Sequence, residues 1–209
     1  MDNRFKDKNI REPLQGFHDT FGQEARIKNF LSAKISETFQ KWGYGQIILP
    51  TIERGSSFSE EVIGGSPWPE WNKRGIFYLH IHDYFTSYDE LPQQTPALLI
   101  PEGTISVSRW LSREMNDKLL SKSLTFFPKK VFYIAPCFRN ELVFKLSEIK
   151  KREFIQVGLE ILGTNNILSD IECFLLLYNG FRSIGIQKKT FYFVLGTLNF
   201  LILCAMNQI

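Results

Sequence analysis

Polar and aromatic side chains alternate with apolar ones along residues 152–161, REFIQVGLEI, in a pattern that could form a ligand site. Successive side chains of a β-strand point to opposite faces, so the segment would carry two different faces. One face is apolar and comprises Ile155, Val157, Leu159 and Ile161; the other comprises Arg152, Phe154, Gln156, Gly158 and Glu160. We expect the first face to pack into a core and the second to form part of a binding surface.

A preceding strand completes this pattern, because Val131–Leu162 reads as two strands joined by a polar loop. The first strand ends at Arg139, and Tyr133, Ala135 and Cys137 share the face of that arginine. Antiparallel pairing of the two strands would set Arg139 beside the polar row of the second. Small residues next to charged ones indicate a flat binding surface against which a ligand can lie.

The residue types suggest which ligand this binding surface would hold. A guanidinium such as that of Arg139 donates two parallel hydrogen bonds to a phosphate or carboxylate. The ring of Phe154 can stack on a flat base, and Gln156 and Glu160 can accept hydrogen bonds from an ammonium group. Together they describe a site for a nucleotide phosphate next to an amino acid. An amphipathic hairpin with a salt-bridged outer face is the alternative, and such hairpins are common.

Helices and strands on either side must position these strands. The apolar spacing predicts a helix from Thr20, with Gln23 completing a capping box, to about Trp42, where Gly43 ends it. A strand follows over Gln46–Ile52, and its Pro50 cannot donate a ladder hydrogen bond, which indicates a sheet edge or an interface.

The middle of the chain predicts strands over Ile76–Ile81 and Leu98–Ile100, separated by a polar loop over Tyr84–Gln94, and a helix from about Thr104. Glu102 falls at the junction of strand and helix, where a carboxylate can be held towards a ligand. The alternative is a carboxylate that only interacts with the positive end of the helix. His80 and His82 share one strand face, but no third ligand is evident, so we expect no metal site.

The C-terminal part predicts a helix over Ser169–Ile184, capped by Ser169 and ended by Gly185. The apolar stretch Phe191–Met206 is shorter than the roughly 18–20 residues that span a bilayer, so we expect no membrane association. It predicts a strand over Thr190–Leu195, a turn over Gly196–Asn199 and the start of a core helix.

Composition is that of an ordinary globular chain. The 209 residues are 44% hydrophobic and 22% charged, with a net charge of +3, which neither requires nor excludes a nucleic-acid partner. Cys137, Cys173 and Cys204 are odd in number and far apart, so neither a disulfide framework nor a zinc site is indicated and a cytoplasmic location is the simplest. The element order predicts an α+β fold, a largely antiparallel sheet flanked by helices.

Several sequence segments resemble motifs of the class II aminoacyl-tRNA synthetases, and in particular those of the histidyl-tRNA synthetase family. FR-x-E at Phe138–Glu141 followed by REFIQVGLE at Arg152–Glu160 resembles class II motif 2. PEGT at Pro101–Thr104 is similar to the LRPEGT signature of histidyl-tRNA synthetases. Three further resemblances are GFHDTFGQEA at Gly16–Ala25, WGYGQIILPTIE at Trp42–Glu53 (class II motif 1) and GLEILGTNNILSDIE at Gly158–Glu172.

The resemblance implies a role for each matching residue. Arg139 would contact the α-phosphate of ATP and the amino-acid carboxylate, Glu141 would fix the adenine end, Arg152 would reach an outer phosphate and Phe154 would stack on adenine. The residues expected to hold the amino acid are Glu102, Thr104, Gln156 and Glu160. The implied chemistry is activation of histidine with ATP and Mg²⁺, then transfer to tRNA. The Trp42–Glu53 region would form a homodimer interface.

The chain also departs from the family pattern. Ile100 stands where LRPEGT has arginine, and neither motif 3 nor the RGLDYY segment is found. We therefore expect a single partial catalytic domain over residues 1–209, without an anticodon-binding domain and at most weakly active alone. Histidyl synthetase-like chains also serve as regulatory subunits of ATP phosphoribosyltransferase, so a non-catalytic partner of that enzyme's catalytic subunit is the alternative function.

Overall fold

The structure is a computed structural model. The structure describes residues 11–63, 75–82, 94–120, 128–140, 144–145, 148–149, 151–186, 196–197 and 200–201. The chain divides into two compact units, each built from separate stretches of sequence. Unit 1 contains Met1–Thr20, Ile47–Thr125 and Tyr133–Gly158, and unit 2 contains Phe21–Gln46, Phe126–Phe132 and Leu159–Ile209.

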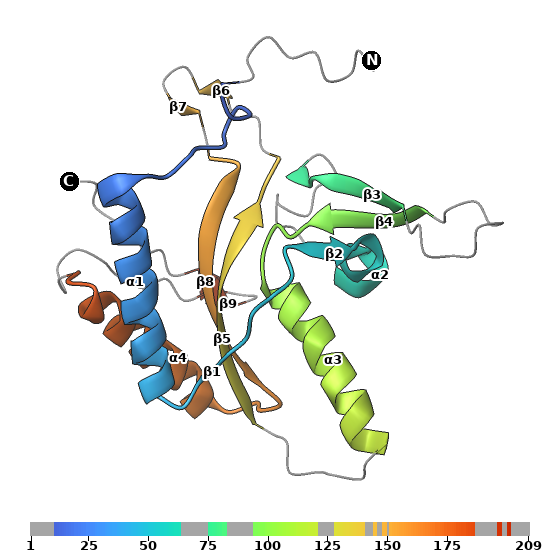
Figure 1. The fold of residues 1–209 in the computed structure, drawn as a ribbon. Helices are drawn as coiled ribbons and strands as arrows, with labels where there is room; N and C mark the ends of the chain where they lie inside the picture. Colours follow the sequence, from blue (N-terminus) through green and yellow to red (C-terminus); the bar gives the residue numbers. More distant parts are fainter. Residues whose placement is uncertain are drawn as a thin grey trace. The chain divides into compact units, whose positions relative to one another are not determined.

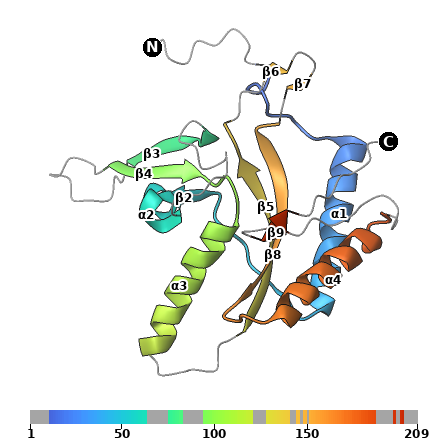
Figure 2. The ribbon, with the colours of Figure 1, turned by 180° about the vertical axis from the view of Figure 1, so that it is seen from behind.

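Unit 1 is organised around a three-stranded antiparallel sheet, visible in Figures 1 and 2 beside the short helix α2. Its strand order is β2-β4-β3, and the register pairs Glu53 with Leu98 and Leu79 with Ala97. The elements are β2 (Ile52–Arg54), the 3-10 helix η2 (Gly55–Phe58), α2 (Glu60–Ile63), β3 (Tyr78–His82), β4 (Gln94–Leu99) and α3 (Thr104–Leu120).

A buried apolar cluster holds this sheet to η2 and α3. Leu98 is fully buried in β4 and packs with Phe58 and Ile76, and Ile105 from the first turn of α3 closes the cluster. Burial of side chains of this size stabilises a fold by roughly 1.5–3 kcal/mol each. The cluster therefore fixes the end of β4 and the start of α3, which are joined by residues 100–103.

Two long strands, β5 (Lys129–Phe138) and β8 (Glu153–Leu162), are neighbours in a second sheet of order β1-β5-β8. Contacts between Tyr133 and Gly158, and between Cys137 and Gln156, show that residue numbers rise in one strand as they fall in the other. The pairing is therefore antiparallel, as predicted. The short strands β6 (Phe144–Lys145) and β7 (Glu148–Ile149) form an antiparallel pair between them in sequence.

Unit 2 packs two helices against each other, α1 (Gly22–Lys41) and α4 (Ile167–Ser183), which lie side by side in Figure 1. Phe39 of α1 is buried and meets the Phe132 ring edge-on, with ring centroids 5.4 Å apart. Gly180 of α4 faces the same phenylalanine, and a Cβ there would lie 3.4 Å from its ring. The missing side chain thus lets α4 approach α1.

Short strands complete unit 2. β1 (Gly45–Gln46) runs parallel to β5, with Gly45 opposite Val131. β9 (Gly196–Thr197) and β10 (Phe200–Leu201) form an antiparallel pair. Phe200 was expected to begin a core helix, and this prediction is wrong for Phe200–Leu201, which are in β10. The strand predicted over Thr190–Leu195 lies outside the described residues.

Both predicted helix caps differ from those observed. Phe21, in an extended conformation, occupies the N-cap of α1 without a side-chain hydrogen bond, so Thr20 lies one residue too far back to cap the helix. Asn166 rather than Ser169 caps α4, and its side chain accepts from the backbone N–H of Leu168 at 2.9 Å. Helix ends are correct, because Gly43 and Gly185 follow the last turns with φ of +81° and +89°.

The strand expected over Gln46–Ile52 is also corrected. Residues 47–51 belong to neither β1 nor β2, and Pro50 lies in this connection. Because proline lacks the N–H that a ladder needs, the segment breaks into two short strands rather than one. By contrast, the helix predicted from Thr104 begins there. Within the described residues, no helix is both long and apolar enough to cross a membrane.

Candidate functional site

The turn at residues 101–104, between β4 and α3, contains the predicted site residues Glu102 and Thr104 and is contacted by two more, Arg139 and Gln156. Arg139 donates from Nε to the carbonyl of Pro101 at 3.2 Å, and the side-chain oxygen of Gln156 accepts from the backbone N–H of Gly103 at 2.8 Å. Two segments that lie far from the turn in the sequence therefore converge on its four consecutive residues. The expected pairing of Arg139 with the polar face of β8 is confirmed, because its guanidinium lies 5.0 Å from the centre of the Phe154 ring.

Glu102 occupies the start of α3, and its carboxylate is buried. One oxygen accepts from the N–H of Thr104 at 2.7 Å and the other from the N–H of Ile105 at 2.8 Å. These bonds satisfy donors of the first helical turn, as the alternative interpretation of Glu102 expected. Each carboxylate oxygen can accept more than one hydrogen bond, so binding of an ammonium remains a compatible second role. Thr104 is exposed beside it as the first residue of α3.

The amide of Gln156 is held in one orientation. Besides Gly103, its oxygen accepts from the hydroxyl of Tyr133 at 3.2 Å and from the thiol of Cys137 at 3.5 Å. A backbone N–H can only donate, so the atom facing Gly103 must be the oxygen. A ligand would therefore meet the NH₂ end of this amide, which donates hydrogen bonds. An ammonium group, which Gln156 was expected to hold, would find acceptors at Glu102 instead.

Cys137 contributes a neutral S–H rather than a nucleophile. Burial, together with the negative charge of Glu102, raises the pKa of the Cys137 thiol to about 12, against the opposing influence of Arg139. The thiolate is the reactive form of cysteine, so this side chain is inert near neutral pH. The described residues hold no other arrangement of groups suited to covalent catalysis at this turn, and the chemistry offered is positioning and charge stabilisation.

Arg152 is engaged by the protein in a different way. Its guanidinium lies 4.6 Å from the centre of the Phe77 ring, and it donates to the carbonyl of Gln15 and to the side-chain oxygen of Asn140. Its backbone N–H also donates to the carbonyl of Gly16 at 2.8 Å. These contacts tie the residue that precedes β8 to Gln15 and Gly16, and its guanidinium also lies 5.9 Å from the centre of the Phe17 ring. Contact with an outer phosphate stays a prediction, and it would require the guanidinium to share or exchange these partners.

The roles of two other predicted site residues, Glu141 and Glu160, depend on other parts of the chain. Glu141 lies outside the described residues. Glu160 belongs to unit 2, where burial, followed by the negative charges of Asp170, Glu172 and Glu160, raises the pKa of Cys173. Their proposed roles stay predictions. Among the described residues, no group of three histidine, cysteine, aspartate or glutamate side chains could hold a metal ion.

One expectation about β8 is wrong at its first apolar position. Ile155 was expected to face a core, yet 52% of its surface is exposed. In unit 1 the packed side of β8 is the one that carries Gln156 and Gly158, because Tyr133 and the 101–104 turn lie against it. Sequence reasoning placed Tyr133 on this face but missed it as a site residue. The even spacing of Tyr133 and Cys137 on one strand was the available signal.

The fold defines a class of protein. Among solved structures, the chain is similar to the ATP phosphoribosyltransferase regulatory subunit/histidyl-tRNA synthetase from Bacillus halodurans. The TM-score is 0.63 at 20% identity, and the match covers 85% of this chain and 39% of that one. This likeness shows the class II aminoacyl-tRNA synthetase catalytic fold, a largely antiparallel sheet flanked by helices. The predicted fold class is confirmed.

The family model described as histidyl-tRNA synthetase matches residues 81–206. The chain belongs to the histidyl-tRNA synthetase family. It is 30% identical over 180 residues to a histidine–tRNA ligase of Metallosphaera sedula, and 29% identical over 193 residues to an ATP phosphoribosyltransferase regulatory subunit of a Cyanothece species. These alignments cover 85% and 90% of this chain but only 35% and 39% of the relatives. The chain thus spans little more than a third of their lengths.

Proposed function

We propose that this chain forms the ATP- and amino-acid-binding part of a histidine-activating site of the histidyl-tRNA synthetase type. The observation that carries the proposal is the convergence of Arg139, Glu102 and Gln156 on the 101–104 turn. A cation, a carboxylate and an amide donor at one turn match the phosphate, ammonium and carboxylate of ATP and an amino acid. The matching family and a histidine–tRNA ligase relative support histidine as the amino acid.

In this proposal each residue has a defined task. Arg139 binds the α-phosphate and the carboxylate, and stabilises the negative charge that grows as the adenylate forms. Adenine stacks on the ring of Phe154. Glu102 and Thr104 hold the ammonium, and the NH₂ of Gln156 donates to the carboxylate. Glu141, Arg152 and Glu160 keep their predicted roles at adenine, the outer phosphate and the amino acid.

Mg²⁺ would enter this site with the nucleotide. The ion usually keeps several waters and binds through substrate phosphates together with one or two carboxylates. Its contribution when bound is to neutralise phosphate charge. The residues of this chain position the two substrates beside each other and hold their charged groups. The pyrophosphate-exchange rate of the 209-residue chain should be well below that of a full-length synthetase, because the chain spans 35% of the related ligase.

Calorimetric titration with ATP and with histidine tests the proposal. Wild-type protein should bind both, and Arg139→Ala should weaken ATP binding by at least tenfold, because a charge-assisted contact to phosphate is lost. Arg113→Ala is the matched control, since Arg113 is exposed on α3 of the same unit. Absence of binding by the wild type, or equal ATP affinity in the two variants, would contradict it.

A regulatory role is the second candidate, favoured by relatives that carry the name ATP phosphoribosyltransferase regulatory subunit. In that role the site senses histidine without using ATP, and the chain assembles with the catalytic subunit of ATP phosphoribosyltransferase. The same titrations distinguish the two functions. Histidine binding without ATP binding, together with co-elution with the catalytic subunit, would favour the regulator, whereas ATP binding that depends on Arg139 would favour the synthetase-type site.

A homodimer formed through the Trp42–Glu53 region is part of the proposal. Ile48 is 89% exposed and Ile52 45% exposed in unit 1, and apolar surface of this kind is typical of an interface. Sedimentation velocity should show a dimer that Ile48→Asp dissociates. Leu14→Asp, at another exposed apolar position, is the control. A monomeric wild type would contradict the dimer without affecting ligand binding.

Two further expectations complete the proposal. A cytoplasmic location fits the free thiols of Cys137 and Cys173, because a reducing compartment keeps such thiols unpaired. Binding of tRNA follows from the proposed synthetase-type function. Filter-binding assays that compare a histidine tRNA transcript with a non-cognate transcript would test it. Fractionation of cells with an antibody to the chain would test the location.

A further inference from the structure

Tyr133 lies between two glycines that come from different segments. It is 2% exposed in β5, with Gly103 of the 101–104 turn on one side and Gly158 of β8 on the other. A Cβ added to either glycine would fall inside the 3.0 Å that real Cβ atoms keep from the outer ring atoms of Tyr133. Neither glycine has a positive φ, so space rather than backbone conformation requires glycine at both positions.

The hydroxyl of Tyr133 adds a second constraint at the same place. It donates to the Gln156 oxygen that also accepts from the Gly103 N–H, so one oxygen receives bonds from β5 and from the turn. The ring thus sets the distance between the turn and β8. The hydroxyl helps keep the Gln156 NH₂ group directed away from these donors.

We infer that Tyr133 is a positioning residue for this site: its ring spaces Gly103 from Gly158 and its hydroxyl orients the Gln156 amide towards the ligand. The inference rests on the proposed function only for what the ligand is. The spacing and the orientation are properties of the protein itself. Two experiments therefore test it, one without ligand and one with ligand.

The first experiment is a size-complementation test of thermal stability. Gly158→Ala should lower Tm by roughly 4–10 °C, because overpacking forces the ring or the strand to move. Tyr133→Leu removes the outer ring atoms, so Gly158→Ala should lower Tm much less in that background. Gly45→Ala is the control, since the nearest atom to a Cβ there is 3.9 Å away. Equal losses in both backgrounds, or a Gly158→Ala variant as stable as Gly45→Ala, would overturn the spacing role.

The second experiment measures the orienting role with Tyr133→Phe, which keeps the ring. Histidine affinity should fall about five- to tenfold while ATP affinity and Tm change little, because the Gln156 amide loses a donor and the ring stays in place. The side-chain NH₂ resonances of Gln156 should shift in the ¹H–¹⁵N spectrum. Tyr78→Phe, at a 52% exposed tyrosine, should leave all of these unchanged.

The outcomes separate the inference from the proposed function. If wild-type protein binds neither ATP nor histidine, the proposed function fails, and the glycine–tyrosine pair and the Gln156 resonances still decide the role of Tyr133. If ligands bind but Tyr133→Phe leaves histidine affinity unchanged, or weakens ATP to the same extent, the orienting role is overturned while the proposed function stands.

Discussion

The side-chain oxygen of Gln156 lies 2.8 Å from the backbone nitrogen of Gly103, although 53 positions separate the two residues in the chain. This hydrogen bond joins β8 to the turn that starts α3. It belongs to a partly buried network in which Tyr133 and Cys137 also donate to the same oxygen. Such a bond makes the turn and the strand parts of one rigid site, because loss of the acceptor leaves several donors unpaired.

The first prediction concerns that acceptor. Gln156→Leu should lower the free energy of unfolding by about 1–3 kcal/mol, since the N–H of Gly103 would lose its partner. Urea denaturation measures the change. Gln40→Leu on α1, where the side chain is exposed and bonds only to the Ser36 hydroxyl, should change stability by less than about 0.5 kcal/mol. Equal losses in the two variants would contradict the role of the Gly103–Gln156 bond.

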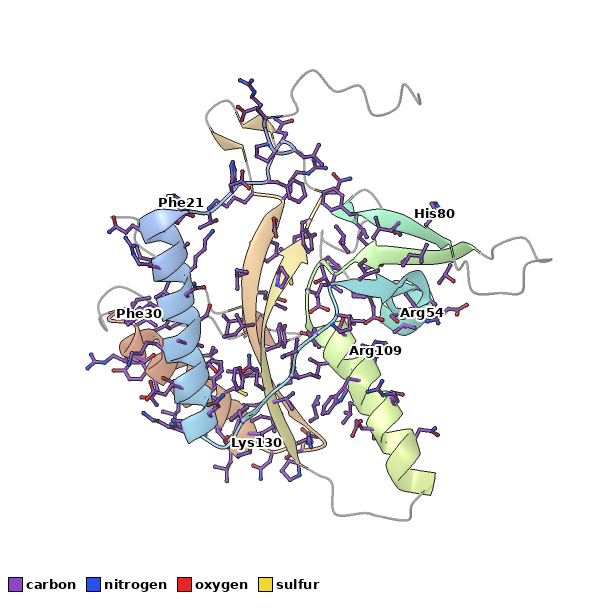
Figure 3. All side chains as sticks on the ribbon, viewed as in Figure 1. Phe21, Phe30, Arg54, His80, Arg109 and Lys130 are labelled. Atoms are coloured by element: carbon purple, nitrogen blue, oxygen red, sulfur yellow. The ribbon has the colours of Figure 1, made fainter. Side chains whose placement is uncertain are left out.

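The second prediction concerns the ion pair between Arg109 of α3 and Glu53 of β2, whose cation is labelled in Figure 3. The atoms are 2.7 Å apart, and Glu53 is 6% exposed. Arg109→Ala should lower the free energy of unfolding by about 1–3 kcal/mol, because it leaves a buried carboxylate uncompensated. The partial exposure of Arg109 keeps this loss below that of a fully buried pair. Chemical denaturation measures it.

Arg54→Ala is the matched control for this pair. Arg54 is the neighbour of Glu53 in β2 and is exposed, and Figure 3 labels it. Its substitution should shift stability by about 0.5 kcal/mol or less. A similar loss for both arginines would show that general charge, rather than the specific bond to Glu53, stabilises this part of unit 1.

The third prediction is a pH dependence carried by Cys137. Burial raises the pKa of its thiol from an ordinary 9.0 to about 12, so the folded protein keeps this proton while the unfolded chain loses it above pH 9. The contribution to stability is therefore fully present below pH 9 and is lost as pH rises from 9 to 12. Cys137→Ser should reduce the downward slope of unfolding free energy in that window by about 1.4 kcal/mol per pH unit.

Urea titrations at several pH values from 8 to 10.5 would measure both slopes. The stability difference between wild type and Cys137→Ser should stay constant below pH 9 and shrink above it. Parallel curves throughout would show that the folded protein releases the Cys137 proton as readily as the unfolded chain does.

The fourth prediction compares two phenylalanines of α1 in unit 2. Phe39 is 1% exposed and packs on Phe132 and Gly180, whereas Phe30, labelled in Figure 3, is 52% exposed. Phe39→Ala should destabilise the protein by about 3–5 kcal/mol through the cavity that it leaves. Phe30→Ala should lower the free energy of unfolding by less than about 1 kcal/mol, because much of its side chain is already exposed. Thermal and urea unfolding would measure both, and comparable losses would contradict the packing of α1 on α4.

Local patterns were enough to predict part of this protein. The alternation of residues 152–161 predicted β8, the stop signals at Gly43 and Gly185 predicted two helix ends, and the apolar spacing after Thr104 predicted the start of α3. These features depend on period and on backbone conformation within a few residues, which the order of residue types determines directly. The resemblance carried by the motifs predicted the family.

Tertiary structure decided what the side chains do. Arg152 is enclosed by Phe77 and residues 15–17, the Gln156 amide turns its oxygen to Gly103, and Tyr133 requires glycine at two distant positions. Even the exposure of Ile155 follows from which face of β8 meets the 101–104 turn. The physical reason is that hydrogen bonds and steric contacts act over a few ångströms between segments separated by tens of residues. No periodicity along the chain encodes which of these segments meet.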